Sequence, residues 1–387
     1  MLASVINIES LEMKTTLDRV LLWLMAPLAM AILALPANAD AGRRKLIISQ
    51  DAYGPGGSNM QSILMLLQAS DVDVLGIVVG SGDGWRDENI QHTLRLLEIA
   101  GRPEVPVYAG TVFPLLNSAE KTQRWESLYG ELSYKGAWSK PIDKKRHADP
   151  YVVPALPEGM AAIKPAAEPG VDFMIRKVHE FPGQVTIWAA GPLTDLAVAA
   201  RLDSSFSSLA KELVFMGGSF RPVPAANAFA DEYRHNTRLE FNLRWDPEAA
   251  SIVLHEPWKK VLQVPVDPTT ATMFRPELLA RIANGKTPFA SYIGQYGQPF
   301  PMWDELAAMV WIDPGIVKAS STMLVDVDTS FTAGYGNTLS WALGKGPRLG
   351  ERPVLVIQEI DVPRFEQLTV DLLTRPQTVN SERAQAQ

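Results

Sequence analysis

Cysteine is absent from the 387-residue chain. Without it the chain forms no disulfides and lacks the lipid-carrying cysteine of a bacterial lipoprotein. Its stability must therefore come from an apolar core, for which a content of 47% hydrophobic residues is sufficient. Clusters of Lys and Arg are also missing, and the formal net charge is −7. Because nucleic-acid binding needs clustered positive charge, this composition argues against a nucleic-acid partner and favours a small molecule.

The first 39 residues have the pattern of a secretory signal. An apolar run, "LLWLMAPLAMAILAL", precedes "PANADAG", in which Ala37 and Ala39 flank Asn38 as in an A-x-A cleavage site. We expect residues 1–39 to be a signal peptide and the protein to be periplasmic or secreted. The alternative is a membrane anchor, but the apolar run is short for a membrane span, so we expect no stable anchor.

Apolar strand-like runs alternate with helical patterns in the rest of the chain. "KLIIS" precedes "MQSILMLLQAS", and "VDVLGIVVG" precedes "ENIQHTLRLLEIAG". Strands that are apolar on both faces indicate a parallel sheet covered by helices on each side. We therefore predict an α/β fold with an open, mostly parallel, Rossmann-like sheet. No linker interrupts residues 40–387, which we expect to form a single domain. Ligands of such sheets bind beyond the carboxyl ends of the strands.

One segment, residues 117–171, breaks this alternation. It contains Trp125, Tyr129, Tyr134 and Trp138 among many Lys, Pro and Gly residues. Long irregular segments are either functional covers of a site or ordinary surface excursions. We interpret this segment as an insertion, and the sequence leaves both roles open.

Polar residues follow several of the predicted strands. Asp51 ends "KLIISQD", Asp83 lies in "GSGDGW", and Asp304 lies near a helix start in "PMWDELAAMVW". "LEFNLRWDPEAA" adds Glu240 and Asn242. Carboxylate, amide and carbonyl oxygens on one rim are the ligands of a hard cation such as calcium. The alternative for each Asp is the capping of a helix.

Several motifs in order resemble the inosine-uridine-preferring nucleoside hydrolase family. They include "GRPEVPVYAG", "VTIWAAGPLTDLAVAARLD", "ELVFMGGSF", "EFNLRWDPEAA" and "MWDELAAMVWIDP", and the resemblance spans Lys45–Thr329. It implies a nucleoside hydrolase fold and hydrolysis of the N-glycosidic bond of a nucleoside to base and ribose. It further implies a calcium cofactor and assembly into dimers or tetramers.

The resemblance also implies a metal site. Asp51 takes the place of the family aspartate that ligates calcium and accepts the proton of the attacking water. Ala190 stands where the family uses a strand-end carbonyl oxygen as a ligand, and Asp304 matches a late aspartate ligand. These residue types suit the reaction, because the site must activate a water, orient it and bind a diol rigidly.

The same resemblance implies which residues bind the sugar and which lie beside the leaving base. Glu240 and Asn242 match residues that hold the ribose hydroxyls, and Met216 of "MGG" matches a residue of the sugar pocket. Trp303 stands where many members place a histidine that protonates the leaving base, and its ring could stack on a purine or pack into the core. We predict His235 as the replacement acid, with Asn236 beside it in the substrate pocket.

The turn after Asp51 departs from the family pattern. Two family aspartates fall at Asn59 and Met60, and another falls at Ser49. We expect Asn59 to replace the lost metal or diol contact, with Asp83 as a compensating carboxylate on the substrate side. Fewer negative charges predict weaker calcium binding. The alternative is that the glycines only make a turn and that Asn59 or Ser58 caps the helix that follows.

These observations predict an exported nucleoside hydrolase with Asp51 as its base. Two other functions remain open at this point. One is a nucleoside- or sugar-binding protein that has lost turnover, which the missing aspartates suggest. The other is a hydrolase of a different N-ribosyl substrate, since the insertion could reshape the base side of the pocket.

Overall fold

The computed structural model describes residues 42–132, 134–139, 147–221 and 239–376. Arg44–Gln387 forms one compact unit. The predicted signal peptide, residues 1–39, lies outside the described residues. In the described ranges, no helix is both long and apolar enough to cross a membrane.

A nine-stranded sheet runs through this unit in the order β3-β2-β1-β4-β5-β6-β9-β7-β8. All neighbours from β3 to β9 pair in parallel, and only β7 pairs antiparallel, with β9 and with β8. The strands are β1 Arg44–Gln50, β2 Val72–Val79, β3 Val107–Ala109, β4 Val185–Ala189, β5 Glu212–Met216, β6 Val261–Val264, β7 Val317–Val327, β8 Thr338–Trp341 and β9 Pro353–Ile360. The predicted mostly parallel sheet is confirmed.

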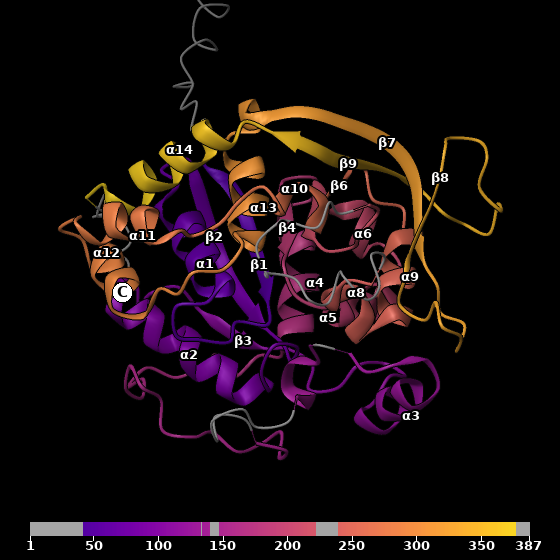
Figure 1. The fold of residues 1–387 in the computed structure, drawn as a ribbon, viewed down its shortest axis with the longest axis horizontal. Coiled ribbons are helices and arrows are strands. Elements are labelled where there is room, and N and C mark those ends of the chain that lie inside the picture. The colour runs from indigo at the N-terminus through magenta and orange to yellow at the C-terminus, as the bar shows by residue number, and fades with distance from the viewer. Residues whose placement is uncertain (1–41, 133, 140–146, 222–238, 377–387) are drawn as a thin grey trace, which may run out of the picture. The chain divides into compact units, whose positions relative to one another are not determined.

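Helices cover both faces of the sheet, and each face has its own apolar core (Figure 1). The first core contains α1 Ser58–Gln68, α2 Arg86–Ile99, α10 Val266–Thr269, α11 Pro276–Ala283, α12 Pro288–Tyr296, α13 Trp303–Ile312 and α14 Val362–Thr374. The second contains α4 Gly170–Glu180, α5 Thr194–Leu202, α6 Phe206–Leu209, α8 Phe241–Trp245 and α9 Pro247–His255. Strands β4 and β5 are buried along their whole length, as their apolar sequences predict.

Short polar signals set where several helices begin. Asp246 accepts a hydrogen bond from the amide of Ala249 at the start of α9, and Pro247 occupies the first turn. Thr287 caps α12 in the same way, also with a proline in the first turn. A side-chain acceptor satisfies an amide that has no partner within the helix, and proline has no amide to satisfy.

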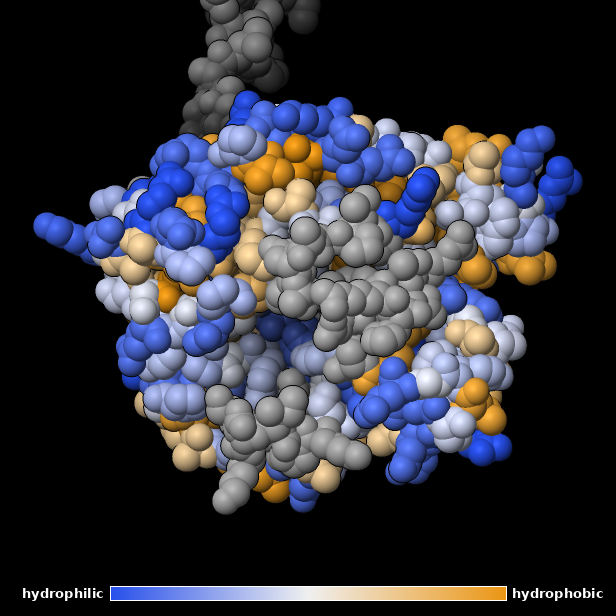
Figure 2. Space-filling model, viewed as in Figure 1, coloured by the Kyte–Doolittle hydropathy of each residue, from blue (hydrophilic) through white to orange (hydrophobic). Residues whose placement is uncertain are grey.

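The strand order reverses between β1 and β4. The chain continues from β1 to β2 and β3 on one side, and from β4 to β5 and β6 on the other. The connections therefore leave a crevice at the carboxyl ends of these two strands, which is the usual ligand site of an open parallel sheet. Asp51 follows β1 and Ala190 follows β4, so both lie at this position. The molecular face in Figure 2 is hollowed near its centre, with hydrophilic residues at the bottom of the hollow.

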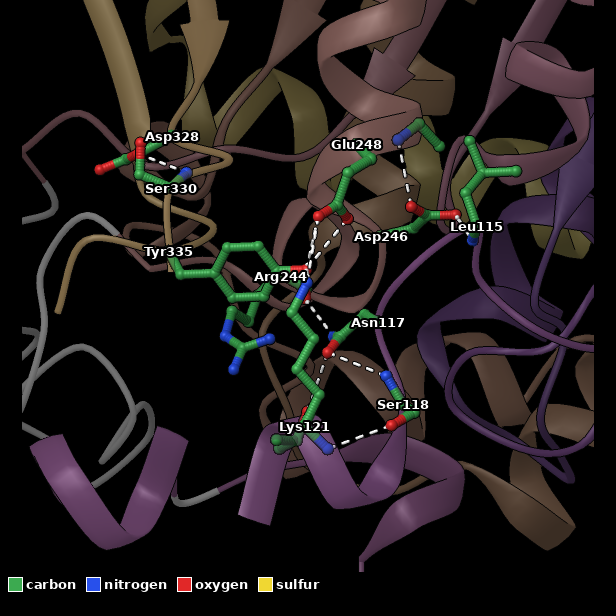
Figure 3. A network of polar contacts seen from close by, with 12 residues as sticks. Leu115, Asn117, Ser118, Lys121, Arg244, Asp246, Glu248, Asp328, Ser330 and Tyr335 are labelled. Atoms are coloured by element: carbon green, nitrogen blue, oxygen red, sulfur yellow. Dashed lines mark hydrogen bonds and ion pairs between the residues drawn. The ribbon is translucent and has the colours of Figure 1, made fainter. Parts of the chain in front are cut away.

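The first part of the insertion is a docked helix, α3 Ala119–Tyr129 (Figure 3). Lys121 Nζ donates to Glu248 (3.2 Å) and to the Tyr335 hydroxyl (2.8 Å), and that hydroxyl donates to Glu248. Asn117 Nδ2 donates to the carbonyl oxygens of Arg244 and Trp245. Because these partly buried contacts tie α3 to α8 and α9, this part of the insertion is a fixed surface element.

The buried carboxyl of Asp195 predicts a pH-dependent stability. Its Oδ1 accepts from the amide of Thr111 (2.7 Å), and burial raises its pKa to about 6. A pKa raised by folding means that the folded state binds the proton more tightly, so the contribution of Asp195 to stability is greatest below about pH 4 and is lost as the pH rises through 6. Between pH 4.5 and 7.5 this contribution falls by about 2 kcal/mol, and we expect Asp195→Asn to remove that fall. Urea unfolding of both proteins at pH 4.5 and 7.5 measures it, and equal pH slopes would contradict the assignment.

Candidate active site at the carboxyl ends of β1 and β4

Asp51 is held at the end of β1 by contacts to both of its carboxylate oxygens. Its Oδ2 accepts from the backbone amide of Asp83 (2.8 Å), and its Oδ1 accepts from Asn59 Nδ2 (3.2 Å). The side chain is buried against Gly82, where an added Cβ atom would lie 2.1 Å from Oδ2. Only glycine permits this close approach of the β2 end to the carboxylate. The conformation of Asp51 is therefore fixed.

Asp304 reaches the same position from α13, which lies more than 250 residues later in the chain. Gln50 Nε2 donates to Asp304 Oδ2 (3.1 Å), and Asn59 Nδ2 lies 3.4 Å from the same oxygen. Asn59 also contacts Asp51, so its amide bridges the two carboxylates. All four side chains are buried. The structure thus brings together the predicted residues Asp51, Asn59 and Asp304.

Both carboxylates are electrostatically strained. Burial raises the pKa of Asp51 well above its usual value, and the nearby charge of Asp83 raises it further. Burial likewise raises the pKa of Asp304, with the charge of Glu305 as the next cause. Charged carboxylates packed in a low-dielectric site are unfavourable unless positive charge or hydrogen bonds compensate them. A bound cation would supply that compensation.

The donor types at this position fit a hard cation. The carboxylates of Asp51 and Asp304 and the amide oxygen of Asn59 are suitable ligands once the Asn59 amide turns its oxygen inward. Ala190 is adjacent, because its amide donates to Ser49 and a Cβ on the next residue, Gly191, would lie 2.9 Å from Asp51 Oδ1. Within the described residues, no group of three or more His, Cys, Asp or Glu side chains forms a ready metal cluster. Any cation here relies on amide and carbonyl oxygens as well.

Glu240 and Asn242 lie on α8, beside the end of β5. The Glu240 carboxylate caps this helix, since it accepts from the amides of Asn242 (2.8 Å) and Leu243 (3.0 Å) and also from Gly218 (2.9 Å). Asn242 Nδ2 donates to the carbonyl oxygen of Met216 (3.3 Å). The charge of Asp83 contributes to the raised pKa of Glu240, after burial. The predicted sugar-binding residues Glu240, Asn242 and Met216 therefore form one buried group within electrostatic reach of Asp83.

Asp83 links this site to the second part of the insertion. Its Oδ1 accepts from the Tyr134 hydroxyl (2.8 Å), and the Tyr134 ring packs edge-on against Phe241 of α8. The amide of Ala137, in the short helix η1 Gly136–Trp138, donates to the carbonyl oxygen of Gly82 (2.9 Å). Residues 134–138 are thus a wall beside the candidate site, whereas α3 is anchored elsewhere.

The base-side residues are only partly described. Trp303 is half-buried at the start of α13, with its ring parallel to Phe300 at 6.4 Å. His235 and Asn236 lie outside the described residues. The other four histidines of the chain each contact a carboxylate other than Asp51, and His92 also packs edge-on against Tyr53 in the turn after Asp51. They pair as His92 with Glu158, His147 with Glu88, His179 with Asp203 and His255 with Asp326.

A cavity of about 600 Å³ lies next to the insertion and does not contain the carboxylates. Trp85, Phe113 and Trp138 line it, together with the start of α3. Ala137, whose amide contacts Gly82, also lines this cavity. Because neither Asp51 nor Asp304 lines this cavity, we place the chemistry at the strand ends and not here.

Sequence reasoning missed three residues of the site. Gln50 contacts Asp304 and accepts from the amide of Asp51 (2.9 Å). Ser58 Oγ donates to Glu305 Oε2 (2.6 Å) inside the protein. A signal existed for Gln50, which is a polar residue at the end of an otherwise apolar buried strand. Glu305 stands in an apolar helix, where a carboxyl without a charged partner is similarly unusual.

Comparison with known proteins agrees with the fold. The family model for inosine-uridine preferring nucleoside hydrolases matches residues 46–367. The chain is 29% identical over 363 residues to a probable uridine nucleosidase 1 of Oryza sativa subsp. japonica, covering 88% of this chain and 99% of the relative. It is 26% identical over 347 residues to an inosine-uridine preferring nucleoside hydrolase of Crithidia fasciculata, covering 86% and 98% of the two chains.

Solved structures show the same fold. A plant nucleoside hydrolase superposes with a TM-score of 0.66 at 23% identity, over 86% of this chain and all of that structure. A purine-preferring ribonucleoside hydrolase from Gardnerella vaginalis gives 0.64 at 20% identity, over 85% and 98% of the two chains. The motifs and the match over most of the length agree, and the chain belongs to the inosine-uridine preferring nucleoside hydrolase family, as a nucleoside hydrolase.

Proposed function

We propose that the protein hydrolyses the N-glycosidic bond of ribonucleosides to free base and ribose, with calcium as cofactor and Asp51 as the base. The observation that carries this proposal is the meeting of the Asp51 and Asp304 carboxylates around the Asn59 amide at the end of β1. Asp51, Asp304, the carbonyl oxygen of Ala190 and Asn59 would hold the ion. When bound, calcium lowers the pKa of a water and provides positions for vicinal hydroxyls.

Asp51 is suited to accept a proton. Its two contacts keep the carboxylate in one orientation, with its oxygens at the end of β1 where the attacking water would lie. The water proton passes to Asp51 while the water oxygen bonds to the anomeric carbon. The bond from that carbon to the base nitrogen breaks, and its electron pair leaves with the base.

The sugar is held by the group on α8. Glu240 and Asn242 place a carboxylate and an amide in one buried group within electrostatic reach of Asp83, and these can bind ribose hydroxyls rigidly. A rigid diol site raises the rate because the reacting carbon is already in position. Met216 lies beside Asn242 and contributes an apolar side to the pocket.

The leaving base needs a proton donor. The described histidines are committed to carboxylates elsewhere, so we propose His235 for this role, with Asn236 in the substrate pocket and Trp303 as a stacking surface. Export to the periplasm or the medium rests on the sequence of residues 1–39, and assembly into a dimer or tetramer rests on the family. We propose both the export and the assembly on these grounds.

Release of reducing sugar from nucleosides tests the proposed function. We expect purified protein to release ribose from inosine or uridine, two nucleosides named in the family description. Prior treatment with a chelator should lower the rate at least about 100-fold, because the attacking water is no longer activated once calcium is removed. Added calcium should restore the rate. Binding of nucleosides without release of sugar from any of them would contradict the proposal and favour a binding protein.

A further inference from the structure

Helix α13 begins without a capping side chain of its own. Its N-cap residue, Met302, offers no acceptor, and the first turn contains Trp303, Asp304 and Glu305. The amide of Asp304 instead donates to Ser58 Oγ (3.0 Å), the first residue of α1. Ser58 therefore caps a helix that lies 245 positions further along the chain. Such an acceptor matters because the first amides of a helix have no partner within it.

Glu305 completes this arrangement from the third position of α13. Its Oε2 accepts from Ser58 Oγ (2.6 Å), and the residue is fully buried. Its Oε1 has no hydrogen-bond partner among the described residues. The Ser58 hydroxyl therefore accepts from the main chain of α13 and donates to a side chain of the same helix. A serine from α1 thus takes the role that an N-cap side chain usually has within its own helix.

The joined helices carry the two sides of the candidate metal site. Ser58 contacts the main chain of Asp304, and the next residue, Asn59, contacts its side chain at 3.4 Å. Two adjacent residues of α1 thus set both the position and the direction of the Asp304 carboxylate. The same Asn59 amide contacts Asp51. The start of α1 therefore fixes the position of the Asp304 carboxylate relative to the Asp51 carboxylate.

We propose that Ser58 and Glu305 are positioning residues that hold the Asp304 carboxylate in place for a divalent cation. This inference rests on the proposed function, because it concerns the same cation. Neither side chain needs to touch the ion. Residues that orient a ligand through hydrogen bonds commonly change metal affinity about 10- to 100-fold when they are removed.

Calcium titration of apoprotein variants by calorimetry tests the pair. We expect Ser58→Ala and Glu305→Ala each to weaken calcium binding about 10-fold, because Asp304 loses its fixed direction. The double variant should also lose about 10-fold and not about 100-fold, since the two residues act through one contact. Glu305→Gln should stay within about 3-fold, because its amide oxygen still accepts from Ser58.

Ser207→Ala provides the matched control. Ser207 is also fully buried, and its Oγ also contacts a glutamate, Glu256 at 3.4 Å, but neither residue contacts the carboxylate site. This variant should keep the calcium affinity of the wild type even if its melting temperature falls as much as that of Ser58→Ala. A loss of stability alone would therefore not reproduce the expected result.

The outcomes separate this inference from the proposed function. If the wild type binds calcium and releases ribose while Ser58→Ala and Glu305→Ala bind calcium normally, the positioning role is overturned and the function stands. If the wild type neither binds calcium nor releases sugar, the proposed function and the cation role both fail. In that case, hydrogen exchange at the Asp304 amide still tests whether Ser58 caps α13. Faster exchange in Ser58→Ala than in Ser207→Ala supports the cap that Ser58 provides to α13, and equal exchange overturns it.

Discussion

Replacement of Asp51 by Asn should lower kcat by at least about 1,000-fold, because an amide cannot accept the proton of the attacking water. The fold should tolerate the change. The new amide oxygen can still accept from the Asp83 amide, and Asn59 can rotate to offer its oxygen to the new amide nitrogen. We therefore expect nucleoside binding within about 10-fold of the wild type, measured under single-turnover conditions.

Asp195→Asn is the matched control for this variant. Asp195 is also a buried aspartate with a raised pKa, and it accepts from a backbone amide, but it packs near β2 and β3 and not at the Asp304 carboxylate. It should keep wild-type kcat at pH 7. A variant Asp51→Asn with half of the wild-type kcat would show that another group is the base.

Replacement of Asn59 by Asp should make the stability of the protein depend on calcium. The Asn59 amide nitrogen lies 3.2 Å from Asp51 and 3.4 Å from Asp304, so the variant places a third carboxylate between two buried ones. Without a cation we expect a loss of about 2 kcal/mol or more in the free energy of unfolding, from like-charge repulsion and lost hydrogen bonds. With calcium the loss should disappear, because a third carboxylate is a better ligand than an amide.

Urea unfolding with chelator and with about 10 mM calcium, roughly ten times the dissociation constant of the weakest calcium sites, measures this effect. Asn117→Asp is the control, because Asn117 is also buried and donates to two carbonyl oxygens, yet contacts none of the site carboxylates. Its loss of stability should be the same in both conditions. If calcium leaves Asn59→Asp as unstable as chelator does, the cation is not held between Asp51 and Asp304.

The insertion shows how one segment can serve two purposes. Its helix α3 is fixed to α8 and α9 through Lys121 and Asn117, which makes it a structural element. Its later part reaches Asp83 through Tyr134 and Gly82 through Ala137. A docked surface helix and a wall beside Asp83 therefore occupy different stretches of the same segment, and a role as a cover of the site stays a prediction.

The sequence by itself determined the sheet and its class. The apolar runs that form β1 and β2 predict buried strands, because both faces of a parallel strand are covered by helices and its residues are therefore mostly apolar. This pattern can be read from a few neighbouring residues. The polar residue at the end of each run also marks the functional edge, since parallel strands share one carboxyl end. This edge offers Asp51 and Asp83 alike, and the resemblance to the nucleoside hydrolase family is what singles out Asp51.

Only the tertiary structure decided what surrounds Asp51. Asp304 and Glu305 come from a helix more than 250 residues later, and their contacts with Gln50, Asn59 and Ser58 depend on how α1 packs on α13. Such contacts have no sequence period, because they join the starts of two helices across the core. Asn59 could be named from its place in the turn. That its amide lies between two carboxylates, and that its neighbour Ser58 caps the helix carrying one of them, follows only from the packing.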